Sequence, residues 1–217
     1  MAVRFDRALI PPSPDLSFEQ SLFTSGVEWI AGLDEAGRGA WAGPVTAGAV
    51  VFDLHFPLDP LLNTVRDSKQ LRPEQRWRLE PIIKSTALTW GVGFASSEEI
   101  DQIGILPATR LAMTRALESL RIVPGHLLID ALFLPETLVP QTALLKGDQR
   151  SLSIAAASIL AKTARDRFMQ ELADSENRYS FEHNKGYGTR AHQAALLKSG
   201  PCLHHRFSYS PVKRSVK

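Results

Sequence analysis

Cysteine is almost absent from this 217-residue sequence, which contains only Cys202. A single thiol cannot form an internal disulfide and is too few for a cysteine-rich zinc module, so the sequence is typical of a reducing compartment. The sequence also lacks any run of about 18 apolar residues, the length that a transmembrane helix needs. Its first 14 residues lack the apolar core of a secretory signal. We therefore expect a cytoplasmic protein with no membrane attachment.

The overall composition is that of an average globular protein, with 44% apolar and 22% charged residues. A chain of this composition can bury a sizeable core, which excludes a disordered tail, a collagen and a coiled coil. The length fits one domain with a short appendage. A monomer is the simplest expectation.

Positive charge is concentrated near the C-terminus, although the net charge is only +2. Seven basic residues and no acidic residue lie between Lys185 and Lys217, whereas the preceding 184 residues hold 18 basic and 23 acidic side chains. A basic segment beside an acidic body is the pattern of a polyanion-binding protein with a carboxylate site. A solvated basic C-terminus explains the same charges equally well.

Runs of apolar residues predict an α/β fold with a five-stranded mixed sheet, flanked by helices and followed by a helical C-terminal extension. The runs 27–33 and 45–52 are joined by a connection too short for a crossover, so they pair antiparallel, and 86–95 extends this antiparallel part. The strands 126–130 and 142–146 alternate with helices, which favours parallel pairing with the first strand. Helices are predicted at 72–85, at 97–120 with a break near Pro107, at 151–172 and at 191–198.

Four acidic side chains follow the apolar strands of this predicted sheet. Asp34 and Glu35 end the first strand, Asp130 ends the fourth and Asp148 follows the fifth. Because the C-terminal ends of neighbouring parallel strands meet at one edge of a sheet, we expect these carboxylates to converge. Taken singly, Asp148 could be a helix cap and the others turn residues. None of these roles taken singly explains their joint placement, which favours a shared site.

Convergent carboxylates repel one another unless cations neutralise them. Oxygen ligands without cysteine or a matched histidine favour Mg²⁺ or Mn²⁺ over Zn²⁺, and the adjacent His204 and His205 are weak evidence for a transition-metal site. Two divalent ions roughly 4 Å apart could clamp the attacking and leaving oxygens of a phosphodiester. Gly37-Arg38-Gly39, directly after the first two acids, can present backbone N–H groups to sugar or phosphate oxygens.

The string Gly32-Leu33-Asp34-Glu35-Ala36-Gly37-Arg38-Gly39 resembles the signature of the ribonuclease HII family. Further matches follow in the same order, so that the resemblance covers about residues 28–212. They are Ala42-Gly43-Pro44-Val45, Asp67-Ser68-Lys69-Gln70-Leu71, Ile129-Asp130, Lys146-Gly147-Asp148, the segment 155–162 with Arg165-Asp166, the segment 184–189, His192, Gly200-Pro201, His205-Arg206, Ser208 and Pro211-Val212.

The resemblance implies a ribonuclease H-like fold and an endonuclease that cuts the RNA strand of RNA/DNA hybrids. It also implies nicking of DNA duplexes 5′ of embedded ribonucleotides, which leaves 3′-hydroxyl and 5′-phosphate ends. The four acids would bind two Mg²⁺ or Mn²⁺ ions. Residues 1–27 would be an N-terminal extension of no assigned role, 28–200 the catalytic domain and 201–217 a basic tail.

The resemblance also assigns residues to the substrate. The loop Gly37-Arg38-Gly39 would read the ribose 2′-hydroxyl, the group that distinguishes RNA from DNA. Tyr187 would stack on the deoxyribose after the ribonucleotide, and Lys69 would contact a phosphate. Nothing in these motifs identifies a sliding-clamp partner.

The departures from the family pattern are small. Tyr209 stands where a phenylalanine is common, and Ala131 follows Asp130 where many relatives have glycine. Two other functions remain open: a DNA nuclease of the same fold, such as a resolvase, and a non-catalytic nucleic-acid-binding module. The first would cut DNA without ribonucleotides, and the second predicts loss of at least one acid.

Overall fold

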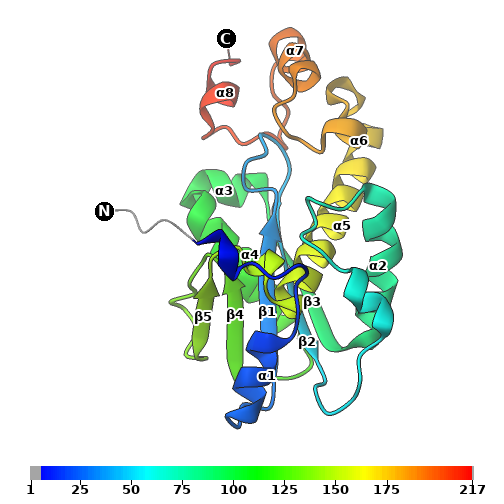
Figure 1. The fold of residues 1–217 in the computed structure, drawn as a ribbon. Helices are drawn as coiled ribbons and strands as arrows, with labels where there is room; N and C mark the ends of the chain where they lie inside the picture. The colour runs from blue at the N-terminus through cyan, green and yellow to red at the C-terminus, as the bar shows by residue number, and fades with distance from the viewer. Residues whose placement is uncertain (1–5, 217) are drawn as a thin grey trace.

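The fold is built on one five-stranded sheet, seen in a computed structural model that describes residues 6–216 (Figure 1). The strand order is β3-β2-β1-β4-β5. β1 pairs antiparallel with β2, and β2 with β3, whereas β1–β4 and β4–β5 are parallel. The predicted mixed sheet is confirmed. Its strands are β1 (Ile30–Ala36), β2 (Val45–Phe52), β3 (Ala87–Ala95), β4 (His126–Asp130) and β5 (Gln141–Leu144).

Helices cover both faces of this sheet. In Figure 1, α2 and α5 lie on one side, α6 to α8 gather at the top of the view and α1 lies at the bottom. None of the described helices is both long and apolar enough to cross a bilayer. The helices are α1 (Ser17–Thr24), α2 (Pro73–Thr86), α3 (Ser97–Ile103), α4 (Ile105–Glu118), α5 (Leu152–Ser175), α6 (Phe181–Asn184), α7 (Arg190–Ser199) and α8 (Ser210–Lys213).

The two faces of the sheet bury different clusters of side chains. Leu33, Leu127 and Ile129 face α4, where they pack with Met113. Leu128 faces the other way and packs with Ile154 of α5. Because side chains alternate along a strand, this division fixes the direction of every residue in β1 and β4.

Two glycines bring α5 into direct contact with the sheet. A Cβ on Gly32 of β1 would lie 2.3 Å from the backbone carbon of Ser153, and one on Gly48 of β2 would lie 2.3 Å from the carbonyl oxygen of Ala157. Real Cβ atoms do not approach other atoms this closely, so any side chain here would push the helix outward. The small alanines of α5 complete this close packing.

The structure differs from the predicted helices in two respects. The break between α3 and α4 falls at Gly104, which has φ = +83°, and not at Pro107. Pro107 instead lies in the first turn of α4, where a missing N–H removes no helical hydrogen bond. No helix was predicted at α1, and within the predicted helical C-terminal extension the positions of α6 and α8 were not predicted. The last two are four-residue helices too short for a periodic pattern to show.

We expect Gly32→Ala to destabilise the fold by roughly 1 to 3 kcal/mol, the usual effect of overpacking a core. The methyl group would have to displace the start of α5 from β1. Urea denaturation followed by circular dichroism measures this change. Gly39→Ala is the matched control, because no atom lies within 4 Å of a Cβ at that exposed position. Equal unfolding free energies for the two variants would contradict the close packing.

Candidate functional site

Asp34 lies near the C-terminal end of β1 and points toward α5. It is two residues beyond Gly32 and pairs in register with Gly48, the glycines against which α5 packs. Its side chain is buried, with only 2% of its surface exposed. Ser158 of α5 lies beside this carboxyl and lowers its pKa. Oδ1 accepts a hydrogen bond of 2.7 Å from the Glu35 N–H, whereas Oδ2 is buried without a partner among the described residues.

Asp130 is the last residue of β4 and shares this face. The parallel register pairs Leu33 with Ile129, so Asp130 follows beside Asp34. Oδ1 of Asp130 accepts a hydrogen bond of 2.7 Å from the backbone N–H of Gly147. That hydrogen bond ties the end of β4 to the turn that precedes α5.

Asp148 lies in this turn, a short 3₁₀ segment over Gly147–Gln149. Lys146, with φ = +56°, starts the turn, and the Ser151 N–H closes it by donating to the Gly147 carbonyl at 2.8 Å. Ser151, not Asp148, caps α5 through its hydroxyl. The carboxyl of Asp148 is therefore free to join Asp34 and Asp130. One oxygen from each of these three acids lies within 4.8 Å of the other two.

Glu35 does not belong to this group of three. It nevertheless lies near the group, because its charge raises the pKa of Asp34 and the charge of Asp130 raises the pKa of Glu35. Its Oε1 lies 3.3 Å from the guanidinium of Arg38, and its Oε2 is buried without a described partner. Burial raises the pKa of this carboxyl, although the Arg38 charge opposes the rise. Glu35 thus borders the group from the side of the Gly37-Arg38-Gly39 loop.

The electrostatics of the three acids follow from burial and mutual repulsion. Burial raises the pKa of Asp34, Asp130 and Asp148, and nearby carboxylates raise it further. For Asp148 the pKa reaches about 7. Lys69 Nζ lies 3.8 Å from Asp148 Oδ2 on an exposed side chain, and a contact of that kind provides little compensation. A group of oxygen ligands in this condition fits divalent cations of the Mg²⁺ and Mn²⁺ type.

A further carboxylate, Asp67, borders the group and was not selected from the sequence. It is buried, and its charge is one of the causes that raise the pKa of Asp148. Its oxygens accept hydrogen bonds from the Lys69 N–H at 2.9 Å and from Gln149 Nε2 at 3.2 Å. Asp67 therefore orients the Lys69 backbone and the Asp148 turn together. Its place in the Asp67-Ser68-Lys69 motif was the available signal.

Two buried arginines hold the Gly37-Arg38-Gly39 loop. A Cβ on Gly37 would meet the Arg165 side chain at 2.0 Å, and the φ of Gly37 is +94°. Arg206 donates to the Arg38 carbonyl at 2.8 Å. Arg38 and Gly39 themselves are exposed, and their backbone N–H groups donate to no other described residue.

Tyr187 lies beside this loop. Its half-buried ring has the Arg165 guanidinium 5.3 Å and Lys162 Nζ 5.6 Å from its centroid. The Trp41 N–H donates to the Gly186 carbonyl at 2.8 Å, which connects the two segments. Because Arg165 contacts both the tyrosine ring and Gly37, one side chain of α5 sets their relative position.

Two fully buried histidines support the Tyr187 backbone. The Cys202 N–H donates to His205 Nδ1 at 3.0 Å, so His205 Nε2 carries the proton and donates to His192 Nε2 at 3.0 Å. His192 Nδ1 then donates to the Tyr187 carbonyl at 3.0 Å. Burial lowers the pKa of both rings, to about 4 for His205. Cys202 contacts Nδ1 of His205, and His192 contacts Nε2 on the other side of the ring. In this arrangement the three side chains do not converge on one point, so they cannot together bind one transition-metal ion.

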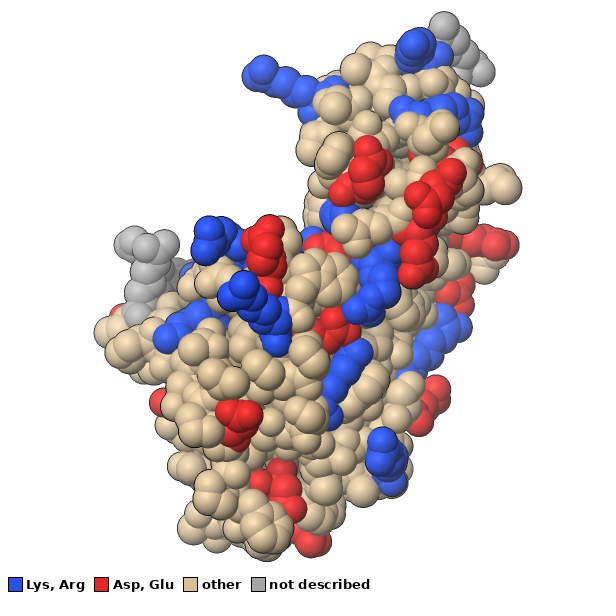
Figure 2. All heavy atoms as spheres, turned by 90° about the vertical axis from the view of Figure 1, so that its right-hand side faces the viewer, with Lys and Arg blue, Asp and Glu red and all other residues tan. Residues whose placement is uncertain are grey.

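The basic residues of the C-terminal segment are not all on the surface. Arg206 is fully buried, and Lys185 Nζ donates to the Glu182 carbonyl. Figure 2 shows basic and acidic side chains interspersed on the face that it presents, without a uniformly positive surface. The exposed basic residues of the described segment are Arg190, Lys198, Lys213 and Arg214.

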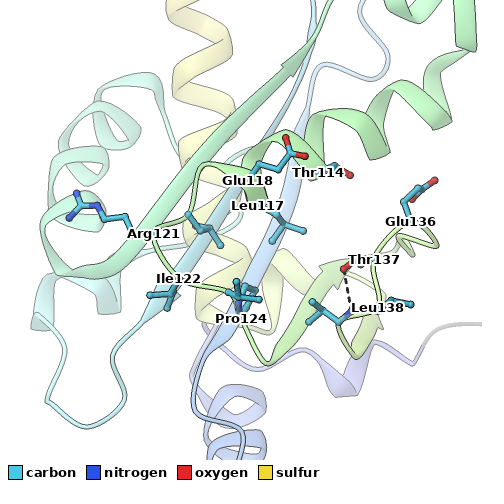
Figure 3. A pocket seen from close by; sticks show the side chains of 12 residues that line it. Thr114, Leu117, Glu118, Arg121, Ile122, Pro124, Glu136, Thr137 and Leu138 are labelled. Carbon is cyan, nitrogen blue, oxygen red and sulfur yellow. Dashed lines mark hydrogen bonds between the residues drawn. The ribbon is translucent and has the colours of Figure 1, made fainter.

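A cavity of about 620 Å³ lies apart from these residues, between the connections that flank β4 (Figure 3). Its wall is mainly apolar and includes Leu117, Ile122, Pro124 and Leu138. None of the acids and none of the predicted substrate residues line it.

Comparison with known proteins gives the family. The model of the family described as ribonuclease HII matches residues 31–212. The chain belongs to the ribonuclease HII family. It is therefore an enzyme of the ribonuclease H class, an endonuclease that acts on RNA paired with DNA.

Similar proteins cover nearly the whole chain. Ribonuclease HII of Roseiflexus castenholzii is 51% identical over 200 residues, which are 92% of this chain and 89% of the relative. Ribonuclease HII of Chlamydia muridarum is 49% identical over 201 residues, 92% of this chain and 90% of the relative. The crystal structure of ribonuclease H2 from Pyrococcus horikoshii superposes with a TM-score of 0.69 at 27% identity, covering 86% of this chain and 96% of that one. The ribonuclease H-like fold is thereby confirmed.

In the metal-free ribonuclease HII, we expect Asp148→Asn to increase stability at pH 8. The pKa of Asp148 is about 7 in the folded chain against an ordinary 3.8, so the folded chain binds more protons than the unfolded chain between these values. Stability consequently falls as pH rises through this window, and the loss is complete above it. Asparagine does not titrate, so the Asp148→Asn variant does not lose this free energy of folding as the pH rises.

Urea unfolding in EDTA measures this effect. The gain at pH 8 should be roughly 1 kcal/mol or more, because one pKa unit corresponds to about 1.4 kcal/mol. The two proteins should differ least well below pH 3.8, where the aspartate is protonated in both states. A lower urea midpoint for Asp148→Asn at pH 8 would show that Asp148 is not destabilised by its surroundings.

Proposed function

We propose that this ribonuclease HII cuts the RNA strand of RNA/DNA hybrids and nicks DNA duplexes 5′ of an embedded ribonucleotide, leaving 3′-hydroxyl and 5′-phosphate ends. The observation that supports this most strongly is the joint placement of three acids, two of them buried and Asp130 half-buried, beside an exposed glycine loop. Asp34 of the acid group and Gly37 of the loop are three residues apart on one strand and its extension. A phosphodiester at the acids would therefore have its sugar within reach of the loop.

The metal-binding residues in this proposal are Asp34, Asp130 and Asp148, with Glu35 at the border of the group. They fit divalent cations because the site contains oxygen ligands, raised carboxyl pKa values and buried oxygens that lack a partner among the described residues. Two bound Mg²⁺ or Mn²⁺ ions would supply a nucleophilic water and stabilisation of the departing 3′-oxygen. The protein's part is to hold the carboxyl groups close together, and the Gly147 N–H orients Asp130 by donating to its Oδ1.

The substrate residues form the rim of this group. The N–H groups of Arg38 and Gly39 are available to a 2′-hydroxyl, the only group by which a ribonucleotide differs in its sugar. Lys69 and Arg38 expose their cationic ends beside the acids, where they can contact the phosphates of a duplex. Contacts of this kind favour binding that weakens with salt and depends little on base sequence.

Tyr187 is the second residue proposed to recognise the sugars of the cleaved strand. An aromatic ring that is half-exposed, backed by Arg165 and Lys162, offers a flat surface to the sugar that follows the ribonucleotide. Its position beside the Gly37 loop supports recognition of two adjacent nucleotides, one by its 2′-hydroxyl and the next by the absence of that group. A DNA nuclease of the same fold would not need this pair, and a non-catalytic module would not need the acids.

The decisive experiment compares a duplex that carries one ribonucleotide with an all-DNA duplex of the same sequence. With Mg²⁺ or Mn²⁺ we expect nicking 5′ of the ribonucleotide only, and none in EDTA. Asp130→Asn should reduce the rate more than about a hundred-fold, since loss of a ligand exceeds the 10- to 100-fold effect of altering its hydrogen-bonding neighbours. Denaturing gels with end-labelled strands give both the position and the rate. Equal cutting of the all-DNA duplex would refute the proposal.

Tyr187→Ala tests the junction contact separately. Stacking contributes about 1 to 3 kcal/mol in comparable contacts, so kcat/KM on the single-ribonucleotide duplex should fall about ten-fold or more. Tyr187→Phe keeps the ring and should retain most of the activity. Calorimetric titration with Mn²⁺ alone should give the same affinity for both variants. If Tyr187→Ala cleaves at the normal rate, the residue has no part in substrate binding.

A further inference from the structure

The first helix contacts the segment that carries Asp148, although the two are more than a hundred residues apart. Glu19 of α1 is 2% exposed. Its Oε1 accepts hydrogen bonds from the Ser151 hydroxyl at 2.6 Å, the Ser153 N–H at 3.0 Å and the Ser153 hydroxyl at 2.5 Å. One carboxylate oxygen thus binds three donors at the start of α5.

Asp15, two residues before the start of this helix, adds a second connection. The Leu152 N–H donates to the Asp15 carbonyl at 2.8 Å, and Asp15 forms a parallel bridge with Ser151. Leu22 and Phe23 of α1 pack against the apolar cluster that contains Ile154. The segment from Asp15 to α1 therefore fixes the beginning of α5 by backbone, side-chain and apolar contacts.

Hydrogen bonds lead from Glu19 to the acids in three steps. Glu19 binds the Ser151 hydroxyl, the Ser151 N–H donates to the Gly147 carbonyl at 2.8 Å, and the Gly147 N–H donates to Asp130 Oδ1 at 2.7 Å. Asp148 lies inside the turn that these bonds close. Displacement of Ser151 would therefore alter both Asp130 and Asp148.

The burial of this carboxylate has an energetic penalty that packing alone would not require. Burial raises the pKa of Glu19, and Oε2 is buried without a described partner. An apolar side chain would avoid this desolvation. The start of a helix partly offsets it, because its free N–H groups and positive dipole end favour a negative group. The gain specific to an acceptor oxygen at this position is the fixed position of Ser151 and Ser153.

We propose that Glu19 is a positioning residue for the metal-binding acids: it fixes Ser151, and thereby the Gly147–Gln149 turn, so that Asp130 and Asp148 converge before any ion binds. This inference rests on the proposed function of these acids. It gives the N-terminal segment a role in metal affinity with no contact to substrate.

The test uses the full chain with Glu19→Ala and two comparison variants. Glu19→Gln keeps an acceptor oxygen for the serines. Met113→Ala makes a cavity on the opposite face of the sheet and controls for a general loss of stability. Hydrogen exchange of the peptide 145–153, measured by mass spectrometry without metal, reads the turn directly. Titration calorimetry with Mn²⁺ alone then gives the affinity, and cleavage assays give kcat and KM.

We expect Glu19→Ala to exchange faster in this peptide and to bind Mn²⁺ about ten-fold more weakly, with KM for the duplex unchanged. Glu19→Gln should restore most of both properties, and Met113→Ala should resemble the wild type. If Glu19→Ala does not fold, Ser153→Ala removes one donor and allows the same comparison.

Two results would overturn the proposal: wild-type exchange and Mn²⁺ affinity in a folded Glu19→Ala, or an equal weakening of Mn²⁺ binding in Met113→Ala. Failure of the wild-type protein to cleave the ribonucleotide duplex would instead count against the proposed function. The exchange measurement distinguishes the two failures, because it involves neither metal nor substrate.

Discussion

The close packing of α5 on β1 and β2 is the constraint on which the site depends. Gly32 and Gly48 have no side chains to separate the helix from the sheet, so the N-terminal turn of α5 lies directly beside the strand that carries Asp34. Like charges do not converge spontaneously in a soluble protein. Here the apolar clusters on both faces of the sheet supply the free energy that holds them together. Packing determines the positions of the acids, and bound cations would neutralise their mutual repulsion.

That arrangement explains why ion pairs contribute little to the geometry of the site. Lys69 is the one cation within 4 Å of the three acids in the described chain, and its side chain is exposed. The two fully buried arginines, Arg165 and Arg206, donate to backbone carbonyls of the segments 38–44 and 185, and no ion pair joins them to a carboxylate of the described residues. Positive charge is thus kept out of the acid group and used to shape the loops beside it. A lysine or arginine inside the group would compete with metal ions for the same oxygens.

The sequence predicted much of the fold and part of the site, for physical reasons that differ between elements. β2 and β4 occur at the predicted residues because their apolar runs end sharply in turn residues. α1 was missed because only a short helix packs there, and its decisive residue, Glu19, is a buried carboxylate that any pattern reads as exposed. Glu35 was predicted as a ligand with the other acids, and its place at the border of the group, 3.3 Å from Arg38, depends on the conformation of the loop that follows β1. Asp67 and the His192–His205 pair depend on contacts between distant segments, which periodicity does not encode.

The helix α5 and the strand β1 run side by side, and residues spaced along one lie opposite residues spaced along the other. This spacing relates the proposed cleavage site to the proposed 2′-hydroxyl contact. Ser153 lies against Gly32, Ser158 neighbours Asp34, and Arg165 lies under Gly37. From Ser158 to Arg165 the helix rises about 10 Å at about 1.5 Å per residue. From Asp34 to Gly37 an extended chain covers about 10 Å at about 3.3 Å per residue. Because the two distances agree, α5 can contact Asp34 through Ser158 and the glycine loop through Arg165 at the same time. An insertion or deletion in the helix between Ser158 and Arg165 would move Arg165 away from Gly37. The distance between the proposed cleavage point and the proposed 2′-hydroxyl contact is therefore set by backbone geometry.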